Sequence, residues 1–213
     1  MRILLTNDDG IDAPGIRALH TALSGLGEIT TIAPYTVQSA TSHGVTFHEP
    51  LLVHQTVMDD GSVGYAVDGR PADCVKVAMQ SLWREIHGDD SRPDITISGM
   101  NAGANVGINV IYSGTVAAAV ESAFLGVPSI AVSLHLGDRS RTRFARAAEI
   151  GRVAIDRVLE HPLDPHAVIN VNVPRTESDD APMPPMRVCP MNTAPGAGHY
   201  EKRTSPDRKS TRL

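Results

Sequence analysis

The sequence predicts an α/β protein with a three-layer, Rossmann-like core built around a mostly parallel sheet. Short apolar runs with the character of buried strands alternate with segments of helical periodicity over residues 1–173. The links between them are short, which is typical of strand–helix–strand units in a parallel sheet. Beyond this region prolines crowd a stretch with little periodicity, so residues 174–213 are expected to form a C-terminal extension.

The first strand–helix–strand unit is expected at the N-terminus. Apolar residues 2–6 predict a buried strand, and Pro14 stands where a helix can begin. Residues 16–26 carry apolar side chains at helical spacing. Residues 28–33 predict a second strand, which ends at Pro34.

A β-hairpin is expected to interrupt the parallel sheet. After a polar loop at residues 35–43, residues 45–56 and 62–67 have strand character. The Asp60-Gly61 pair between them is a strong turn signal.

The remaining core elements alternate in the same way. Helical periodicity over residues 71–82 is followed by a short buried strand at 94–98 and a Gly- and Asn-rich loop over 99–109. A helix over 113–125 and a strand over 129–134 come next.

The core is expected to close with a long helix and a last strand. Thr142 is a candidate N-cap for a helix whose apolar face extends to Val158. Residues 167–173 predict the last strand, which ends at Pro174. The polar, basic end at residues 202–213 indicates a solvated tail rather than a nucleic-acid-binding surface.

Composition and charge argue against a nucleic-acid-binding, membrane-binding or membrane-spanning protein. A chain of 213 residues can bury one core, and its formal net charge is −5. Binders of nucleic-acid duplexes or acidic membranes need a basic face, so neither partner is expected. No run approaches the roughly 20 apolar residues of a membrane span, and the N-terminus lacks the apolar region of a signal peptide. The two cysteines, Cys74 and Cys189, form no CxxC pattern, so reduced thiols and a cytoplasmic location are expected.

A first polar loop, Asn7-Asp8-Asp9-Gly10, follows the first predicted strand. Adjacent carboxylates repel each other, so a cation is expected to compensate them, and a hard divalent cation with oxygen ligands is the natural candidate. The alternative is a turn in which Asp8 or Asp9 caps the next helix. The Asp-x-Asp-Gly-Thr signature of the haloacid-dehalogenase phosphatases does not occur, because the two carboxylates here are adjacent.

A second polar loop, Ser39-Ala40-Thr41-Ser42-His43, follows the second strand. A serine hydroxyl is a weak metal ligand that is acceptable only beside stronger ones, and the segment alone indicates an ordinary loop. A lone histidine such as His43 more often forms loop hydrogen bonds than takes part in catalysis. It is nevertheless the one candidate for an acid that protonates a leaving group.

The third loop carries the clearest pattern. Residues 98–107 are rich in Gly and Asn, and Ser113-Gly114-Thr115 precedes a run of small residues at 116–119. Backbone N–H groups and hydroxyls at a helix N-terminus form a ready phosphate site, although simple N-capping by Ser113 would also explain the pattern. No Lys follows the glycines, as a Walker loop requires, and the helix starts too late for a dinucleotide fingerprint.

All three loops directly follow predicted core strands. In open parallel sheets, ligands bind just beyond the carboxyl ends of the strands. The three loops are therefore expected to converge on one site.

The chain carries five separated motifs in order: Thr6-Asn7-Asp8-Asp9-Gly10, Ser39-Ala40-Thr41, Pro71-Ala72-Asp73-Cys74-Val75, Ser98-Gly99-Met100-Asn101-Ala102-Gly103-Ala104-Asn105 and Tyr112-Ser113-Gly114-Thr115-Val116. Together they resemble the SurE survival-protein family, whose members are metal-dependent 5′/3′-nucleotidases with a Rossmann-like core. The resemblance covers about the first 175 residues and continues weakly over residues 200–204.

The resemblance implies a set of site residues. The implied metal ligands are Asp8, Asp9, Ser39 and Asn101, and the two aspartates are also the implied catalytic residues. The implied phosphate-binding residues are Asn105, Ser113, Gly114 and Thr115. The implied cofactor is one divalent metal ion per subunit, Mg²⁺ or Mn²⁺.

The chain departs from the family pattern outside the implied site. Asn109 stands where members often carry Asp, and Ser122 where they often carry Gly. The chain also stops earlier than members usually do, and the family's C-terminal arm supports oligomerisation. A homodimer or homotetramer is therefore expected, less stable than that of a longer relative, with the residues after 174 as the least ordered part.

The resemblance and the motifs together predict a metal-dependent 5′-nucleotidase that hydrolyses nucleoside monophosphates to nucleoside and phosphate. A bound metal would lower the pKa of a water molecule, and the N–H groups of residues 113–115 would stabilise the phosphoryl oxygens. Two other classes stay open. One is a non-catalytic nucleotide- or phosphate-binding protein that uses the same residues, and the other is a structural subunit whose acidic turn only caps helices.

Overall fold

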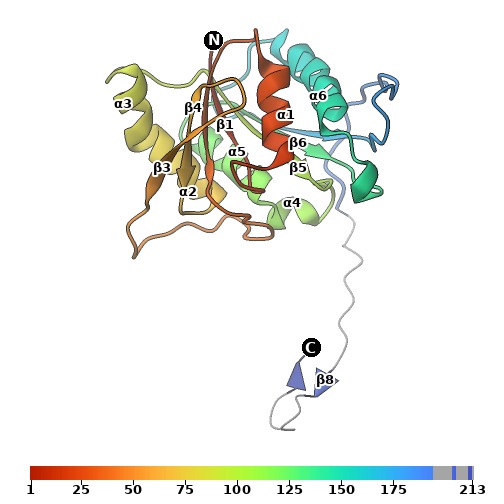
Figure 1. Ribbon diagram of the computed structural model, residues 1–213, viewed down its shortest axis with the longest axis horizontal. Coiled ribbons are helices and arrows are strands. Elements are labelled where there is room, and N and C mark those ends of the chain that lie inside the picture. The colour runs from red at the N-terminus through yellow and green to blue at the C-terminus, as the bar shows by residue number, and fades with distance from the viewer. Residues whose placement is uncertain (194–202, 205–210, 213) are drawn as a thin grey trace.

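In the computed structural model of the chain, which describes residues 1–193, 203–204 and 211–212, seven strands form one sheet (Figure 1). Their order is β3-β4-β2-β1-β5-β6-β7, and all neighbours are parallel except β3, which pairs antiparallel with β4. The predicted parallel sheet with a hairpin is confirmed. The seven strands are β1 (Arg2–Thr6), β2 (Glu28–Pro34), β3 (Val53–Val57), β4 (Val63–Val67), β5 (Ile95–Ala102), β6 (Ser129–Leu134) and β7 (Val168–Val173). A separate antiparallel pair consists of β8 (Arg203–Thr204) and β9 (Thr211–Arg212).

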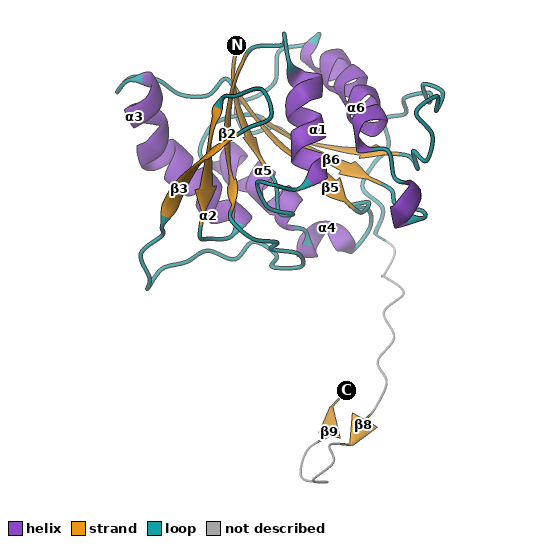
Figure 2. Ribbon diagram, in the orientation of Figure 1, coloured by secondary structure: helices purple, strands orange, loops and turns teal. Residues whose placement is uncertain are grey.

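Helices cover both faces of the sheet, which confirms the three-layer, Rossmann-like architecture (Figure 2). On one face α1 (Pro14–Leu23) packs against α6 (Phe144–Leu159), and on the other α2 (Pro71–Val77) packs against α5 (Gly114–Phe124). Along the described chain, no helix combines the length and apolarity needed to cross a membrane. The shorter helices are a π-helix (Ala78–Leu82), α3 (Trp83–His87), α4 (Asn109–Tyr112) and a 3-10 helix (Arg139–Arg141).

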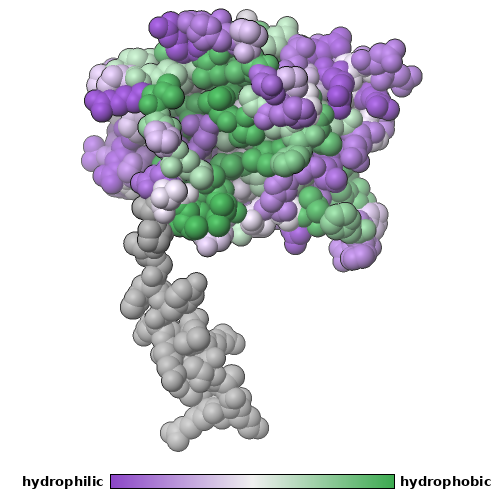
Figure 3. Space-filling model, turned by 180° about the vertical axis from the view of Figure 1, so that it is seen from behind, coloured by the Kyte–Doolittle hydropathy of each residue, from purple (hydrophilic) through white to green (hydrophobic). Residues whose placement is uncertain are grey.

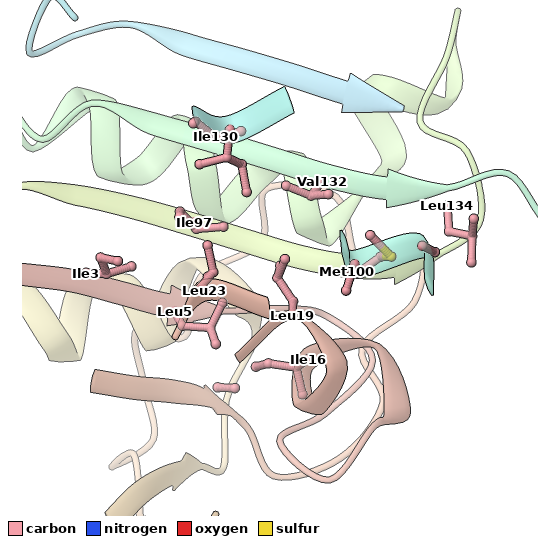
Figure 4. Packing of buried hydrophobic residues seen from close by; sticks show 14 of the residues in the cluster. Ile3, Leu5, Ile16, Leu19, Leu23, Ile97, Met100, Ile130, Val132 and Leu134 are labelled. Carbon is pink, nitrogen blue, oxygen red and sulfur yellow. The ribbon is translucent and has the colours of Figure 1, made fainter. Parts of the chain in front are cut away.

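Strand β1 shows why a short run of apolar residues predicts a strand buried on both faces. Ile3 and Leu5 are fully buried in the cluster that α1 and α6 cover, together with Leu19 of α1 (Figure 4). Leu4, between them, points to the opposite face and packs in the cluster that includes Val75 of α2. Successive side chains of a strand point to opposite faces, so a strand between two helical layers needs apolar residues at every position.

The carboxyl ends of β1 and β5 meet at a point where the strand order reverses. From β1 the chain passes through α1 to β2 on one side, and it returns to β5 on the other side only after the hairpin and α2. The register pairs Thr6 of β1 with Ser98 of β5, so the loops after these two strands begin side by side. Open parallel sheets bind ligands at such reversals.

Strand β5 is longer than the sequence predicts. The composition predicts a loop from Gly99, but the strand continues to Ala102, and its pairing with β6 shifts register after Ser98. At Gly99, φ is 145°, and an added Cβ would lie 2.3 Å from the carbonyl oxygen of Val132. Glycine here allows two backbones to approach closely within the sheet, so the prediction of a loop over residues 99–102 is wrong.

The first strand of the hairpin is shorter than predicted. Strand β3 begins at Val53, so residues 45–52 of the predicted strand lie outside the sheet. Within this segment the backbone N–H and the hydroxyl of Thr46 donate to the two carboxylate oxygens of Asp73, each at 2.8 Å. Asp73 thus satisfies the polar groups of Thr46, which a neighbouring strand would otherwise pair.

Thr142 does not cap α6, so this prediction is also wrong. The residue that precedes the helix is Arg143, whereas the Thr142 hydroxyl donates to the carbonyl oxygen of Asp138 at 3.2 Å. Asp138 starts the 3-10 helix, where its carboxylate accepts from the backbone N–H of Ser140 at 2.9 Å. Asp138 therefore caps the 3-10 helix, and the hydroxyl of Thr142 is used at the end of that helix instead of at the start of α6.

The described part of the C-terminal extension packs against the start of α6. The backbone N–H of Arg143 donates to the carbonyl oxygen of Thr176 at 2.9 Å, and the Arg146 guanidinium donates to that of Ala181 at 2.7 and 2.8 Å. Thr176 is buried. The prediction that the extension is the least ordered part falls in part on residues outside the described chain and stays a prediction.

Candidate metal and phosphate site

The loop after β1 is a tight turn that presents two carboxylates. The side-chain amide of Asn7 donates to the carbonyl oxygen of Gly10 at 2.8 Å, which closes the turn around Asp8 and Asp9. Gly10 has a φ of 97°, in the left-handed region that glycine adopts without strain. The turn therefore fixes two adjacent carboxylates at the carboxyl end of the central strand.

Asp8 lies against the N-terminus of α5. Its side chain is only 4% exposed, and the hydroxyl of Thr115 donates to its Oδ1 at 2.6 Å. A Cβ added at Gly114 would lie 2.8 Å from the Asp8 Cβ, so the helix can come this close only because residue 114 is glycine. A helix N-terminus favours a nearby negative charge, which makes this a suitable place for a buried carboxylate.

Burial raises the pKa of Asp8 from 3.8 to about 6. That pKa already includes the negative charge of Asp9, which raises it, and the hydrogen bonds from the side chain and backbone of Thr115, which lower it. The raised pKa shows that the groups around Asp8 compensate its charge only in part. A carboxylate of this kind is suited to a partner that carries positive charge.

The variant Asp8→Asn is expected to be more stable than the wild type when divalent metal is removed. Because the pKa of Asp8 is raised in the folded state, ionised Asp8 opposes folding at neutral pH. The cost is absent below about pH 4, grows between pH 4 and 6, and is constant above, at about 3 kcal/mol for a shift of this size. Urea unfolding with chelator at pH 4, 6 and 8 measures the difference.

Asp89→Asn provides the control, because it removes an exposed carboxylate and changes the net charge by the same amount. A stability difference between Asp8→Asn and wild type that is the same at all three pH values would contradict this account of Asp8.

Asp9 is fixed by the end of β5. Its Oδ2 accepts from the backbone N–H of Ala102 at 2.9 Å, across 93 residues of sequence. The preceding residue, Asn101, donates its side-chain N–H to the carbonyl oxygen of Gly103 at 2.6 Å. This bond uses the amide nitrogen of Asn101 and leaves its side-chain oxygen available as a ligand. The long β5 thus brings Asn101 and Asp9 to the same edge of the sheet.

Ser39 lies on a loop that is tied to Asp8 by its neighbour. The backbone N–H of Gln38 donates to the carbonyl oxygen of Asp8 at 2.7 Å. The far end of the loop is held by α4, because the hydroxyl of Ser42 donates to the carbonyl oxygen of Ile111 at 2.7 Å. Ser39 itself is exposed. The structure thus brings the Ser39 loop to the two aspartates, and the role of Ser39 as a ligand stays a prediction.

The three predicted phosphate-binding residues at the start of α5 lie in the turn that contacts Asp8. Ser113 is the N-cap, with its hydroxyl accepting from the backbone N–H of Val116 at 3.1 Å, which is the alternative role that the sequence left open for it. The hydroxyl and the backbone N–H of Thr115 both donate hydrogen bonds to Asp8. An anion at this helix N-terminus would therefore lie next to Asp8 and Thr115. Binding of phosphate by residues 113–115 stays a prediction.

Asn105 is fixed by hydrogen bonds to β6 and β7. Its side chain is buried and donates to the hydroxyl of Ser133 at 2.8 Å. Its carbonyl oxygen accepts from Asn170 at 2.8 Å and from Asn172 at 3.1 Å. These contacts fix Asn105 beside β6 and β7, and its role in binding phosphate stays a prediction. Sequence reasoning missed its two asparagine partners, although their spacing of two residues in a strand places both on one face.

His43 is also paired elsewhere. Its Nε2 lies 2.6 Å from Glu121 of α5, and Lys76 lies 3.8 Å from the same carboxylate. This ion-pair cluster helps to hold the loop that carries Ser39 against α5. A role for His43 as an acid toward a leaving group would require it to leave Glu121, so the contacts favour a positioning role.

Three oxygen atoms near the ends of β1 and β5 are buried without a hydrogen-bond partner in the described chain: Thr6 Oγ1, Asn7 Oδ1 and Ser98 Oγ. Buried polar atoms are normally paired, so this edge of the sheet suits water or a bound ligand. The described residues contain no cluster of three or more His, Cys, Asp or Glu side chains. A metal here would rely on two carboxylates and neutral oxygens, which fits a hard ion such as Mg²⁺ or Mn²⁺.

A pocket of about 590 Å³ opens beside Asp9. The loops that follow β1, β2 and β6 contribute to it together with Ala102, the last residue of β5, so it lies at the carboxyl edge of the sheet. Most of its side chains are apolar or small. Its lining residues are Asp9, Gly10, Asp12, Ala13, Pro14, Gly15, Tyr35, Thr36, Val37, Ala102, Leu136, Arg139, Thr142 and Phe144.

The fold and the site define a Rossmann-like α/β protein with a paired-carboxylate loop at the end of its central strand. The family model described as survival protein SurE matches residues 3–196. The chain belongs to the SurE family.

Individual relatives agree with this assignment. The 5′-nucleotidase SurE of Rhodopirellula baltica is 44% identical over 206 residues, which cover 97% of this chain and 78% of the relative. The 5′-nucleotidase SurE of Heliobacterium modesticaldum is 47% identical over 178 residues, which cover 82% of this chain and 61% of the relative. The crystal structure of the SurE protein from Aquifex aeolicus matches with a TM-score of 0.79 and 32% identity, over 97% of this chain and 79% of that one.

Proposed function

We propose that this chain is a metal-dependent phosphomonoesterase that hydrolyses nucleoside monophosphates to nucleoside and phosphate, the 5′-nucleotidase reaction. The observation that carries the proposal is the pair Asp8–Asp9, fixed at the end of β1 beside the N-terminus of α5. The relatives named 5′-nucleotidase SurE support an enzyme over a protein that only binds nucleotide or phosphate. They also favour it over a structural subunit whose acidic turn only caps helices.

One Mg²⁺ or Mn²⁺ ion per subunit is the cofactor of this proposal. Asp8, Asp9, Ser39 and Asn101 would hold it through four oxygen atoms. Such an ion neutralises phosphate charge and lowers the pKa of water, which is the chemistry that phosphomonoester hydrolysis needs. The two carboxylates and the unpaired buried oxygens beside them support a hard, oxygen-ligated ion.

Residues of the chain would orient the two aspartates and the attacking water and would stabilise the phosphoryl oxygens. Thr115 orients Asp8 through the 2.6 Å hydrogen bond, and Ala102 orients Asp9 through its backbone N–H. The Oδ1 of Asp9 is not used by Ala102, so it can orient an attacking water molecule. The first turn of α5, at residues 113–115, contributes the positive end of a helix dipole toward the phosphoryl oxygens. Asn105, buried beside Ser133, is the least direct of the proposed phosphate-binding residues.

Phosphate release from AMP in the presence of Mn²⁺ or Mg²⁺ tests the proposal against its alternative. Steady release is expected, with adenosine and phosphate formed in equal amounts. Binding of AMP without turnover under the same conditions would identify a non-catalytic nucleotide-binding protein. A panel of 5′- and 3′-nucleotides with each base then gives the substrate preference.

Replacing Thr115 by Val is expected to weaken the binding of both Mn²⁺ and inorganic phosphate. The hydroxyl is fully buried and donates to Asp8, so its loss leaves Asp8 with one partner fewer while the size of the side chain is kept. A charge-assisted hydrogen bond of this kind is worth about 1.5–3 kcal/mol, or roughly 10- to 100-fold in affinity. Calorimetric titration of Mn²⁺ and the inhibition constant of phosphate measure the two effects.

Thr115→Ser is the matched control, because serine keeps the hydroxyl that bonds to Asp8. Val and Ser variants with equal affinity for both ions would show that this hydroxyl does not support the site.

We also propose a homodimer or homotetramer. Figure 3 shows hydrophobic residues gathered over the face opposite to the view of Figure 1. Large apolar side chains exposed on α4 and α5 include Ile111, Tyr112 and Phe124. Large exposed apolar side chains of this kind are suited to burial against a second copy of the chain. Light scattering gives the assembly mass, and a monomer at micromolar concentration would contradict the proposal.

A cytoplasmic location belongs to the same proposal. Cys74 and Cys189 are both free, as is usual in a reducing compartment. Fractionation of cells that express the full chain tests this location, and recovery outside the cytoplasmic fraction would contradict it.

A further inference from the structure

A row of three polar residues crosses the sheet at its carboxyl edge. Asn101 of β5 pairs in register with Ser133 of β6, and Ser133 pairs in register with Asn172 of β7. Register partners in neighbouring parallel strands point to the same face of the sheet, so the three side chains lie side by side. This polar row therefore connects a proposed metal ligand to the strand at the edge of the sheet.

Asn105 spans the last two members of the polar row. It lies in the loop between β5 and α4, is only 5% exposed, and donates from its side-chain amide to the hydroxyl of Ser133 at 2.8 Å. Its backbone N–H donates to Oδ1 of Asn172 at 2.9 Å, and its carbonyl oxygen accepts from Nδ2 of Asn172 at 3.1 Å. One side chain thus pairs both backbone polar groups of a loop residue, as a neighbouring strand would.

Asn170 supports the same loop residue through a single bond. It lies two residues before Asn172 on the same face of β7, and its side chain donates to the carbonyl oxygen of Asn105 at 2.8 Å. The two contacts differ in kind. Loss of Asn170 leaves that carbonyl oxygen with its bond from Asn172, whereas loss of Asn172 leaves the buried N–H of Asn105 without a partner.

The secondary structure of β7 does not itself call for these two asparagines. Asparagine is depleted in strands, and both side chains are exposed at positions where β-branched residues would favour the strand. Their shared contact with Asn105 gives a reason for their place in the sequence.

The contacts at Asn105 determine where its side-chain amide can point. An amide NH₂ group carries two donors, and Ser133 accepts from this group. With the backbone of residue 105 fixed by Asn172, the second donor has a set direction and is suited to a phosphoryl oxygen. Asn101, in contrast, is part of β5, so its position is set by strand pairing with Ser133.

We propose that Asn172 is a positioning residue for phosphate binding. It clamps the backbone of Asn105 and through it orients the amide that meets the phosphate, and Asn170 assists. The inference rests on the proposed function, because it requires Asn105 to contact the phosphate of the substrate. Neither β7 residue touches the substrate, so their effect passes through Asn105 alone.

The test compares Asn172→Val with Asn170→Val in the full chain. The two variants are matched, because both replace an exposed asparagine on one face of one strand with a good strand former. They differ in that only Asn172→Val removes the partner of the Asn105 N–H. Calorimetric titrations give the Kd of Mn²⁺ and the Kd of inorganic phosphate for the Mn²⁺-loaded protein. Phosphate release gives kcat/KM for AMP, at a temperature well below the thermal midpoint of each variant.

In Asn172→Val the Kd of phosphate is expected to rise, and kcat/KM for AMP to fall, by about 5- to 100-fold, the usual effect when a buried N–H loses its partner. The Kd of Mn²⁺ is expected to stay at the wild-type value, because Asn101 is held by its own strand. Asn170→Val is expected to change phosphate binding in the same direction by a smaller factor. A role in stability alone would lower the thermal midpoint and leave the Kd of phosphate unchanged.

An unchanged Kd of phosphate in Asn172→Val, or an equal weakening of phosphate and Mn²⁺ binding, would overturn the positioning role. If Asn172→Val does not fold, Asn170→Val decides, and an unchanged Kd of phosphate in that variant would overturn the role. A wild type that binds phosphate but releases none from AMP would sink the proposed function, while the Kd of phosphate in the variants still decides the role of Asn172. A Mn²⁺-loaded wild type that binds no phosphate would overturn both.

Discussion

Removal of divalent metal is expected to lower phosphate release from AMP by more than about 100-fold, and added Mn²⁺ or Mg²⁺ is expected to restore it. The physical reason lies in the charge of the site. Asp8 and Asp9 are adjacent carboxylates, and burial already raises the pKa of Asp8 to about 6. Without a cation, a phosphate dianion would meet two further negative charges, which disfavours its binding. Dialysis against excess chelator followed by a phosphate-release assay measures the effect.

Chelator that is saturated with Mg²⁺ before use is the control, because it has the same ionic strength and cannot remove metal. Full turnover after dialysis against free chelator, with metal content confirmed to be below one-hundredth of the protein concentration, would contradict metal dependence. The roles of Asp8, Asp9, Ser39 and Asn101 as ligands would fall with it.

The variant Asp9→Asn is expected to lose more than about 100-fold in kcat, because loss of a residue that only supports a metal ligand already costs about 10- to 100-fold. The amide keeps the size of the side chain and one oxygen, which can still accept from Ala102. The second carboxylate oxygen becomes an NH₂ group, which can neither bind a hard cation nor orient a water molecule by accepting its proton. Measurement of kcat at saturating Mn²⁺ separates this loss from a weakened affinity for metal.

The matched control for this variant is Asp89→Asn. Asp89 is exposed in the loop that precedes β5, at the opposite edge of the sheet, and its substitution changes the net charge by the same amount. Wild-type kcat in Asp9→Asn, with a normal thermal unfolding midpoint, would show that Asp9 has no role in catalysis.

Local patterns in the sequence were sufficient where an element depends on its own residues. The bounds of β1 and β6 agree with the predicted runs at residues 2–6 and 129–134, because a strand buried on both faces is apolar throughout. Patterns failed where a distant group decides the structure. Gly99 continues β5 because the backbone at Val132 lies next to it, and Thr46 leaves the sheet because Asp73 binds it.

The candidate site could be predicted in its members but not in its contacts. The position of Asp8 and Asp9 after an apolar run placed them at a strand end, and the carboxyl ends of parallel strands meet at one edge. Ser39 entered only through the resemblance, because a serine in a polar loop has no distinctive pattern. The bond between Thr115 and Asp8 spans 107 residues, and no spacing rule connects positions so far apart.

The long separations within the site have a consequence for the stability of the whole molecule. Asp8 is bonded to a residue 107 positions away, and Asp9 to one 93 positions away, so the site exists only when β1, β5 and α5 are assembled. A fragment that lacks any of these elements has no site. The free energy of metal binding is therefore linked to unfolding of the entire core, and an ion at 100 times its Kd would add about 2.7 kcal/mol to the free energy of unfolding. If the proposed ion binds there, the supply of divalent ions in the surroundings would set how much of the protein is folded as well as how fast it works.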